Sequence, residues 1–311
     1  MKRVLLTGAS GFIGRHTVPR LLDRSYEVHA VGRSGVPAPG ACWHKTDLLD
    51  HAQARSLVMA IRPSHLLHLA WYAEHRKFWT SPENLRWVTA TENLLDVFAY
   101  AGGRRAVVAG TCAEYDWSRG ECDESTTPLA PATRYGICKD STRASMDAWS
   151  SRTGVSGSWG RIFHLYGPYE HPDRLVPSII GALLRDEDAR CTHGRQLRDF
   201  LHVEDVASAF VALLDSDVAG AVNIGSGAAV SIADVAERIA GLLGRQHRLK
   251  LGALEAPPDD PARLLPVVRR LMDELQWRPR HGLDDGLRHT IEWWRAHLQR
   301  NVETRNLEAN H

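Results

Sequence analysis

The chain has 311 residues, of which 43% are hydrophobic and 24% are charged, and its formal net charge is +1. This composition is typical of an ordinary globular protein with one large domain or two modest ones. The Lys and Arg residues form no basic stripe, and no apolar run approaches the roughly 20 residues that cross a membrane, so neither nucleic acid nor a membrane is an expected partner. The five cysteines form no CxxC pair, and we expect no signal peptide, no metal site and a cytoplasmic location.

Short apolar runs alternate with amphipathic stretches along the first half of the chain. Residues 4–6 predict a buried strand, a glycine turn follows, and residues 12–24 predict a helix. Further strands are expected over 27–31, 65–69, 105–109 and 156–162, and further helices over 52–61, 85–101 and 135–152. This order predicts the α/β class, with a doubly wound parallel sheet covered by helices on both faces.

The pattern becomes less regular after residue 162, where prolines and a charged patch mark longer loops. We expect residues 1–162 to form a dinucleotide-binding domain, to which residues 199–226 return. Residues 163–198 and 227–299 are expected to form a smaller substrate-binding lobe over the carboxyl ends of the strands, where open α/β sheets bind ligands. Residues 300–311 are expected to be a frayed polar tail.

The segment TGASGFIG joins the first predicted strand to the first predicted helix. Backbone N–H groups at such a helix N-terminus bind a diphosphate, and glycines let that ligand approach closely. The segment therefore predicts a dinucleotide site lined by Gly8, Gly11, Phe12, Ile13 and Gly14. A tight turn without a ligand is the alternative.

The end of the second predicted strand indicates which dinucleotide binds. An acidic residue there would bind the 2′-hydroxyl of NAD, whereas this chain has Arg33 and Ser34. A guanidinium and a hydroxyl suit a 2′-phosphate. NADP(H) is therefore favoured, and NAD(H) remains the alternative if Arg33 is only a solvated loop residue.

Tyr135 and Lys139 are four residues apart on a predicted helix and therefore share one face. An ammonium near a phenol favours the phenolate, so we expect Lys139 to lower the pKa of Tyr135. A tyrosine of this kind can exchange a proton with a sugar oxygen. A surface pair without function is the alternative for so short a motif.

Seven short segments occur in a fixed order over about residues 1–295. They are TGASGFIG, DL at 47–48, HLA at 68–70, YGICK at 135–139, RIFHLYGP at 161–168, RDFLHVED at 198–205 and NIGSG at 223–227. Together they resemble the extended short-chain dehydrogenase/reductases that act on nucleotide-diphosphate sugars, which have the Rossmann fold. The combination is specific for the family and much less specific for the reaction.

The resemblance implies cofactor contacts at matching positions. Asp47 and Leu48 would hold the adenine, and Leu69 and Ala70 would line the cofactor at the end of a strand. Lys139 would bind the nicotinamide ribose as well as tune the neighbouring tyrosine.

The resemblance also implies contacts with a nucleotide-diphosphate sugar. Thr111 would hydrogen-bond the reacting sugar oxygen, and Tyr135 would act as the acid/base. Arg198 matches a position that contacts the diphosphate, where a guanidinium suits phosphate oxygens. His164 replaces an Asn and can donate a similar hydrogen bond, with a packed core histidine as the alternative. Trp71 is expected either to form the floor of the sugar pocket or to pack in the core.

The segment TCAEY at 111–115 separates the reactions within this family. Members that act as 4,6-dehydratases carry Thr-Asp-Glu at its first three positions, and the two carboxylates transfer the protons of dehydration. Here Cys112, which we expect to contact the substrate, and Ala113 stand there, and neither can do that work. Glu114 follows and, on an extended segment, is expected to face the other way. Hydride transfer at one carbon remains.

The leading prediction is NADP-dependent reduction of a nucleotide-diphospho-4-keto-6-deoxysugar at C4. A nucleotide-diphosphate-sugar 4-epimerase with bound NAD is the alternative and would use the same catalytic residues. A non-catalytic dinucleotide-binding regulator is disfavoured, because Tyr135 and Lys139 are both present. The helices expected over 85–101 and 135–152 resemble those that form a dimer interface in the family, so a homodimer is expected.

Overall fold

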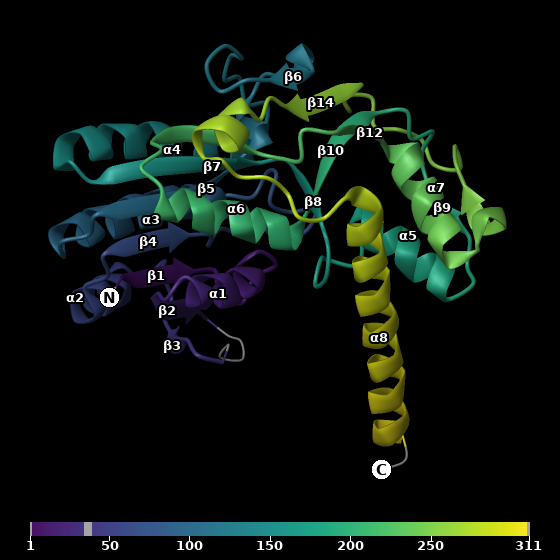
Figure 1. Cartoon of the computed structure of the whole chain (residues 1–311), viewed down its shortest axis with the longest axis horizontal. Coiled ribbons are helices and arrows are strands. Elements are labelled where there is room, and N and C mark those ends of the chain that lie inside the picture. The colour runs from purple at the N-terminus through teal and green to yellow at the C-terminus, as the bar shows by residue number, and fades with distance from the viewer. Residues whose placement is uncertain (1, 34–38, 310–311) are drawn as a thin grey trace.

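A seven-stranded parallel sheet forms the centre of the larger part of the molecule, and the computed structural model describes residues 2–33 and 39–309 (Figure 1). The strand order is β11-β7-β5-β4-β1-β2-β3, and every pair is parallel. The strands are β1 (Arg3–Thr7), β2 (Glu27–Gly32), β3 (Cys42–Lys45), β4 (His65–His68), β5 (Arg105–Thr111), β7 (Ser156–Ile162) and β11 (Gly220–Ile224). The predicted doubly wound Rossmann-like sheet is confirmed.

Helices cover both faces of this sheet. They are α1 (Gly14–Asp23), α2 (His51–Ile61), α3 (Glu83–Tyr100), α4 (Arg134–Thr153) and α6 (Val203–Asp215). Consecutive side chains of β1 point to opposite faces of the sheet, because side chains alternate along a strand. Val4 and Leu6 pack into the core beneath α1 and α6, whereas Leu5 packs into the core beneath α2, α3 and α4. A strand buried on both sides explains the uninterrupted apolar run.

A second region of smaller sheets and helices lies beside the carboxyl ends of these strands (Figure 1). Its mixed sheet contains β12 (Ala229–Ser231), β10 (Leu197–His202), β14 (Arg263–Pro266), β6 (Glu121–Cys122) and β8 (His164–Tyr166). A two-stranded sheet pairs β9 (Ala189–Arg190) with β13 (Leu249–Lys250). Its helices are α5 (Leu175–Leu184), α7 (Ile232–Leu243) and α8 (Leu283–Ala309). Short helical turns are η1 (Cys112–Glu114), η2 (Trp117–Arg119), η3 (Gln246–Arg248) and η4 (Arg270–Glu274).

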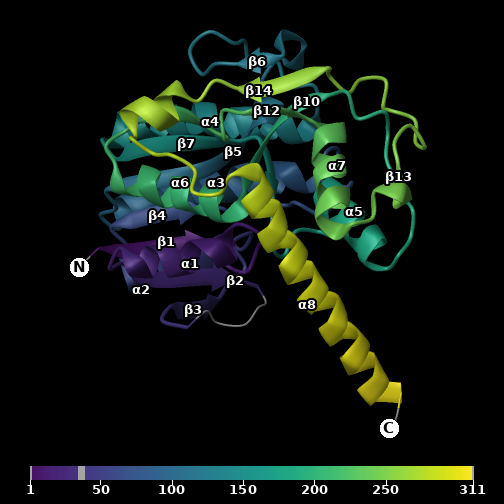
Figure 2. The ribbon, with the colours of Figure 1, turned by 45° about the vertical axis from the view of Figure 1, so that its right-hand side comes forward.

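The long helix α8 extends away from both sheets (Figure 2). It continues to Ala309, through the stretch from residue 300 whose fraying stays a prediction. The division into a dinucleotide-binding domain and a substrate lobe stays a prediction. Among the described residues, no helix combines the length and the apolar character that a membrane crossing requires.

Candidate active site

The glycine turn between β1 and α1 is shaped by two close backbone approaches. Gly8 has a φ of +68°, and a Cβ there would lie 2.8 Å from the backbone nitrogen of Ala70. A Cβ on Gly14 would lie 2.1 Å from the carbonyl oxygen of Gly8. Only glycine fits at these two positions. No described side chain caps the N-terminus of α1, so its first N–H groups can bind an anion.

The other residues predicted to hold the cofactor surround this turn. Gly11 donates its N–H to the carbonyl of Gly8 at 2.9 Å, and Phe12 and Ile13 are half-buried. Ala70 donates its N–H to the Thr7 hydroxyl at 3.2 Å, which brings Leu69 and Ala70 against the glycines. Their predicted role therefore has a consistent geometry, although contact with a cofactor stays a prediction.

The end of β2 carries the residues that are predicted to select the cofactor. Arg33 is exposed directly after the strand, and Ser34 lies outside the described residues. Asp47 accepts a hydrogen bond from the N–H of Leu49 at 3.1 Å, and Leu48 is buried in the core. Arg33, and not a carboxylate, directly follows the end of β2. The preference between NAD and NADP stays a prediction.

Thr111 and Tyr135 meet because α4 begins against the end of β5. Thr111 is the last residue of β5, and Tyr135 lies in the first turn of α4. A Cβ on Gly136 would lie 2.3 Å from the carbonyl oxygen of Ala113, so the glycine permits this close contact between α4 and η1. A side-chain hydrogen bond joins Thr111 to Tyr135. Two of the predicted catalytic residues are therefore adjacent.

The Tyr135 ring is held by aromatic residues of the loop between β4 and α3. It lies edge-on to Phe78 and Trp79, with ring centroids 4.9 and 5.8 Å away. Asn84 anchors this loop by donating hydrogen bonds to the carbonyls of Phe78 and Ser81, at 2.7 and 2.9 Å. Sequence reasoning missed Asn84 because its acceptors are backbone carbonyls, which leave no pattern.

Burial raises the pKa of Tyr135 above its ordinary value. The hydrogen bond with Thr111 and the positive charge of Arg174 oppose this shift. The predicted net lowering of the pKa is therefore wrong for this structure, because loss of hydration outweighs the favourable contacts. The phenol is protonated at neutral pH.

Lys139 is buried below the same site. Its Nζ donates a hydrogen bond to the carbonyl of Ala109 at 2.8 Å and lies 3.8 Å from the centre of the Trp71 ring. Burial lowers the pKa of Lys139 to about 7, against the opposing charge of Glu114. An ammonium has three donors, so Lys139 has the capacity to bind ribose hydroxyls in addition to Ala109.

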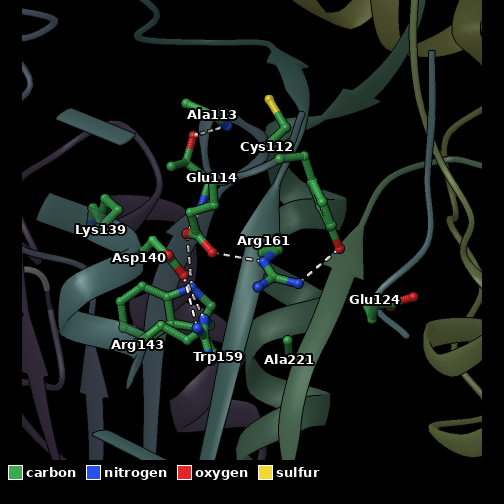
Figure 3. A network of polar contacts seen from close by, with 12 residues as sticks. Cys112, Ala113, Glu114, Glu124, Lys139, Asp140, Arg143, Trp159, Arg161 and Ala221 are labelled. Carbon is green, nitrogen blue, oxygen red and sulfur yellow. Dashed lines mark hydrogen bonds and ion pairs between the residues drawn. The ribbon is translucent and has the colours of Figure 1, made fainter. Parts of the chain in front are cut away.

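Glu114 is fully buried in a polar network under the catalytic strand, and Figure 3 shows it between Trp159 and Arg161. It accepts hydrogen bonds from the backbone N–H of Thr111 at 2.8 Å, from Trp159 Nε1 at 2.9 Å and from Arg161 Nε at 2.7 Å. The segment forms the helical turn η1 rather than the expected extended strand, and this turn directs Glu114 into the core. Its oxygens are committed to these three donors within the core.

Cys112 and Ala113, at the positions of the dehydratase carboxylates, supply no acid or base. Burial raises the pKa of the Cys112 thiol to about 12, so the thiol stays protonated. The Cys112 residue is half-buried, and Ala113 is buried. The chemistry that this segment adds to Thr111 is therefore limited to packing and weak hydrogen bonding.

Two residues predicted to bind the sugar nucleotide lie in the mixed sheet. Arg198 is buried, forms an ion pair with Asp260 and donates to the carbonyl of Leu197 at 2.8 Å. His164 lies on β8, and burial lowers its pKa to about 3, so its ring is neutral. The Arg198 charge thus already has a partner, and substrate contact by Arg198 or His164 stays a prediction.

Two residues next to the catalytic group come from different loops: Trp71 from the loop between β4 and α3, and Arg174 from the loop before α5. Trp71 Nε1 donates to Asn84 Oδ1 at 2.8 Å, and the ring packs against Lys139, so Trp71 serves the wall of the site as well as the core. Arg174 is exposed before α5, and its charge reaches both Tyr135 and His164. Sequence reasoning missed Arg174 because its loop belongs to no recognised motif.

A Rossmann-like sheet, a glycine turn under a helix N-terminus and an adjoining Thr-Tyr-Lys group define a dinucleotide-dependent enzyme of the extended short-chain dehydrogenase/reductase class. The chain belongs to the NAD dependent epimerase/dehydratase family, whose model matches residues 4–225. Its homologues are enzymes that act on nucleotide sugars.

Curated relatives match most of the chain. UDP-glucuronic acid decarboxylase 1 of Xenopus tropicalis is 28% identical over 319 residues, which cover 96% of this chain and 73% of that protein. The dTDP-6-deoxy-L-talose 4-dehydrogenase (NAD(+)) of Aggregatibacter actinomycetemcomitans is 29% identical over 260 residues, which cover 80% of this chain and 92% of that protein.

Solved structures match the fold over nearly its full length. MoeE5 in complex with UDP-glucuronic acid and NAD is 34% identical, with a TM-score of 0.84 over 94% of this chain and 99% of that one. UDP-glucose 4-epimerase of Thermotoga maritima, with UDP-glucose, has a TM-score of 0.87 at 22% identity, over 95% of this chain and 99% of that one, and shows the fold alone.

Proposed function

We propose that this protein is an NAD-dependent 4-epimerase of a UDP-linked hexose or hexuronic acid. The observation that carries the proposal is the commitment of Glu114 to the buried network, beside a thiol and a methyl at the dehydratase positions. Thr111, Tyr135 and Lys139 are then the acid/base groups that remain, and they suffice for hydride transfer at one carbon. The 34% identical MoeE5, solved with NAD and with UDP-glucuronic acid or UDP-glucose, supports the choice of cofactor and nucleotide.

The residues present fit a bound dinucleotide. Gly8 and Gly14 allow the turn to pack tightly against Ala70 and against its own backbone, and the uncapped N–H groups at the start of α1 suit a diphosphate. The spare donors of Lys139 suit ribose hydroxyls. When bound, NAD supplies a hydride acceptor that later returns the hydride.

Tyr135 moves the proton of the substrate C4 oxygen. Oxidation at C4 requires the phenolate form, which takes that proton; Thr111 and the Arg174 charge favour this form, whereas burial opposes it. During the return step the phenol gives the proton to the C4 alkoxide, and its raised pKa keeps it protonated until that oxygen becomes basic. Thr111 orients the C4 oxygen, and Lys139, whose pKa burial lowers to about 7, offers its N–H donors to the cofactor ribose.

Reduction of a 4-keto-6-deoxysugar with NADPH is the second candidate, and the exposed Arg33 at the end of β2 favours it. A guanidinium there suits the 2′-phosphate of NADPH, and no carboxylate occupies the position. The 29% identical dTDP-6-deoxy-L-talose 4-dehydrogenase is named for a redox reaction at C4 of its sugar.

Two assays separate these candidates. The nucleotide that copurifies with the protein is released by denaturation and identified by mass spectrometry, and the protein is then incubated with UDP-glucose and UDP-glucuronic acid. We expect bound NAD and formation of the C4 epimer without net change in NADH. Rapid oxidation of added NADPH by a dTDP-4-keto-6-deoxysugar, with no epimer from either UDP-sugar, would contradict the epimerase and support the reductase.

A further inference from the structure

Histidines from distant parts of the sequence meet where the start of α8 contacts β10 and α6. His202 ends β10, His281 lies two residues before the start of α8, and His289 lies on α8. One ring nitrogen of each lies within 4.8 Å of the corresponding nitrogens of the other two. The ring centroids of His281 and His289 lie 4.3 and 5.2 Å from that of His202.

The ring nitrogens of this group are available for a ligand. His202 is 1% exposed, and its Nε2 is buried with no hydrogen-bond partner among the described residues. The same holds for Nδ1 of His289. Two buried nitrogens left unpaired in one small volume are costly unless something binds them.

The third ring is oriented by a buried carboxylate. Asp205 Oδ2 accepts hydrogen bonds from His281 Nδ1 at 3.0 Å and from the His281 backbone N–H at 2.9 Å. This bond places the proton of the neutral ring on Nδ1 and leaves the lone pair on Nε2. Histidines that bind metals commonly donate their second N–H to a carboxylate in this way.

We propose that His202, His281 and His289 bind one zinc ion, or another divalent transition metal, that fastens α8 to β10 and α6. Imidazole nitrogens suit Zn²⁺, Co²⁺, Ni²⁺ and Cu²⁺, whereas Mg²⁺ and Ca²⁺ prefer oxygen ligands. His281 and His289 flank the N-terminus of α8, whereas His202 is distant from both in sequence. The expectation of no metal site followed from the spacing of the cysteines and did not consider these histidines. None of the three belongs to the catalytic group.

Metal binding requires a small closure of the site. Tetrahedral zinc with nitrogen ligands places those nitrogens about 3.3 Å apart, so the rings must approach one another by roughly 1.5 Å at most. His202 Nδ1 accepts a hydrogen bond of 3.3 Å from the N–H of Glu204, and zinc at Nε2 would move the ring proton to Nδ1 and break that bond. Loss of one long hydrogen bond is a small cost beside zinc bound by three imidazoles.

The test measures metal uptake by full-length protein made without a polyhistidine tag. The protein is stripped with a chelator, incubated with Zn²⁺, passed over a desalting column and analysed for metal. We expect close to one zinc per chain, a raised melting temperature with Zn²⁺ but not Mg²⁺, and visible absorption bands with Co²⁺ that indicate nitrogen ligation. Absence of retained zinc would overturn the proposal.

Variants assign the ion to this site. His289→Gln and His281→Gln should abolish retention of zinc, and Asp205→Asn should weaken its affinity about 10- to 100-fold. His171→Gln is the matched control, because His75, His171 and Asp173 form a second, more exposed group of potential ligands. Circular dichroism and NAD binding verify that each variant is folded. Loss of zinc in the control together with its retention in His289→Gln would overturn the assignment.

Discussion

Burial and the charge of Glu114 raise the pKa of Tyr135, whereas the Thr111 hydroxyl and the more distant charge of Arg174 lower it. Tyr135→Phe keeps the edge-on contacts with Phe78 and Trp79 but removes the hydroxyl. We expect kcat to fall about 10²- to 10⁴-fold, the usual contribution of a positioned acid/base, with NAD affinity unchanged within a few-fold. Steady-state kinetics and fluorescence titration measure both. Retention of more than a tenth of kcat would contradict the assigned role.

Lys139 makes the stability of the cofactor-free protein depend on pH. Its folded pKa of about 7 lies below the ordinary value of about 10.4, so between these values the unfolded chain holds a proton that the folded chain lacks. Stability therefore rises with pH across this window, by roughly 4 kcal/mol from the one residue. In Lys139→Met this rise should disappear.

Thermal or urea unfolding between pH 7 and 9.5 measures this effect. Lys45→Met is the matched control, because Lys45 is exposed on β3 and its variant should keep the wild-type slope. Parallel stability curves for the wild type and Lys139→Met would show that the buried ammonium is hydrated in solution.

At the residue scale, local sequence predicts which residues share an element but not which partners they meet. Tyr135 and Lys139 lie one turn apart on α4, and contact between them stays a prediction. The contacts of Glu114 and Arg198 have no local signal, because Arg161 and Asp260 come from strands and loops distant in sequence. The segment forms a helical turn instead of the expected extended strand, and this turn places Glu114 in the core.

At the element scale, the start of α4 against η1 sets the catalytic geometry. In Gly136→Ala the new Cβ would lie 2.3 Å from the Ala113 carbonyl oxygen, so α4 must shift. We expect a loss of about 1–3 kcal/mol in stability and, because Tyr135 moves from Thr111, a fall of about 10²-fold in kcat. Chemical denaturation and steady-state kinetics measure the two effects.

Gly241→Ala is the control for this substitution. Gly241 lies on α7, where the nearest atom to a new Cβ is Gln246 Nε2 at 3.9 Å. Alanine should therefore be neutral or stabilising by about 0.5–1 kcal/mol and leave kcat unchanged. Equal behaviour of the two variants would mean that the contact between α4 and η1 is not constrained.

Most elements around the large sheet could be predicted because each is long, periodic or bounded by glycines and prolines. The strand expected over 156–162 matches β7, and the helix expected over 85–101 matches α3 within two residues at its start. β3 was missed because CWHK has neither an apolar run nor a clear alternation. The mixed sheet was missed because its strands pair across the chain and several have only two or three residues.

At the scale of the whole molecule, we propose a homodimer formed through α3 and α4. Leu85 on α3 and Ile137 on α4 are 59% and 53% exposed, which is unusual for large apolar side chains on two helices that pack together. We expect a dimer mass for the wild type and a monomer mass for Leu85→Glu/Ile137→Glu, measured by size-exclusion chromatography with light scattering. Leu251→Glu, at an exposed apolar residue beyond β13, should remain dimeric. A monomeric wild type would contradict the proposal.

The central claim is that Thr111, Tyr135 and Lys139 act on one carbon of a nucleotide sugar and that no second acid/base pair operates. Incubation of the protein with UDP-glucose and UDP-glucuronic acid deuterated at C4, followed by NMR and mass spectrometry, tests it most directly. We expect the C4 epimer, with deuterium retained at C4 and with neither water nor carbon dioxide lost. Loss of water or of carbon dioxide from either sugar would contradict it.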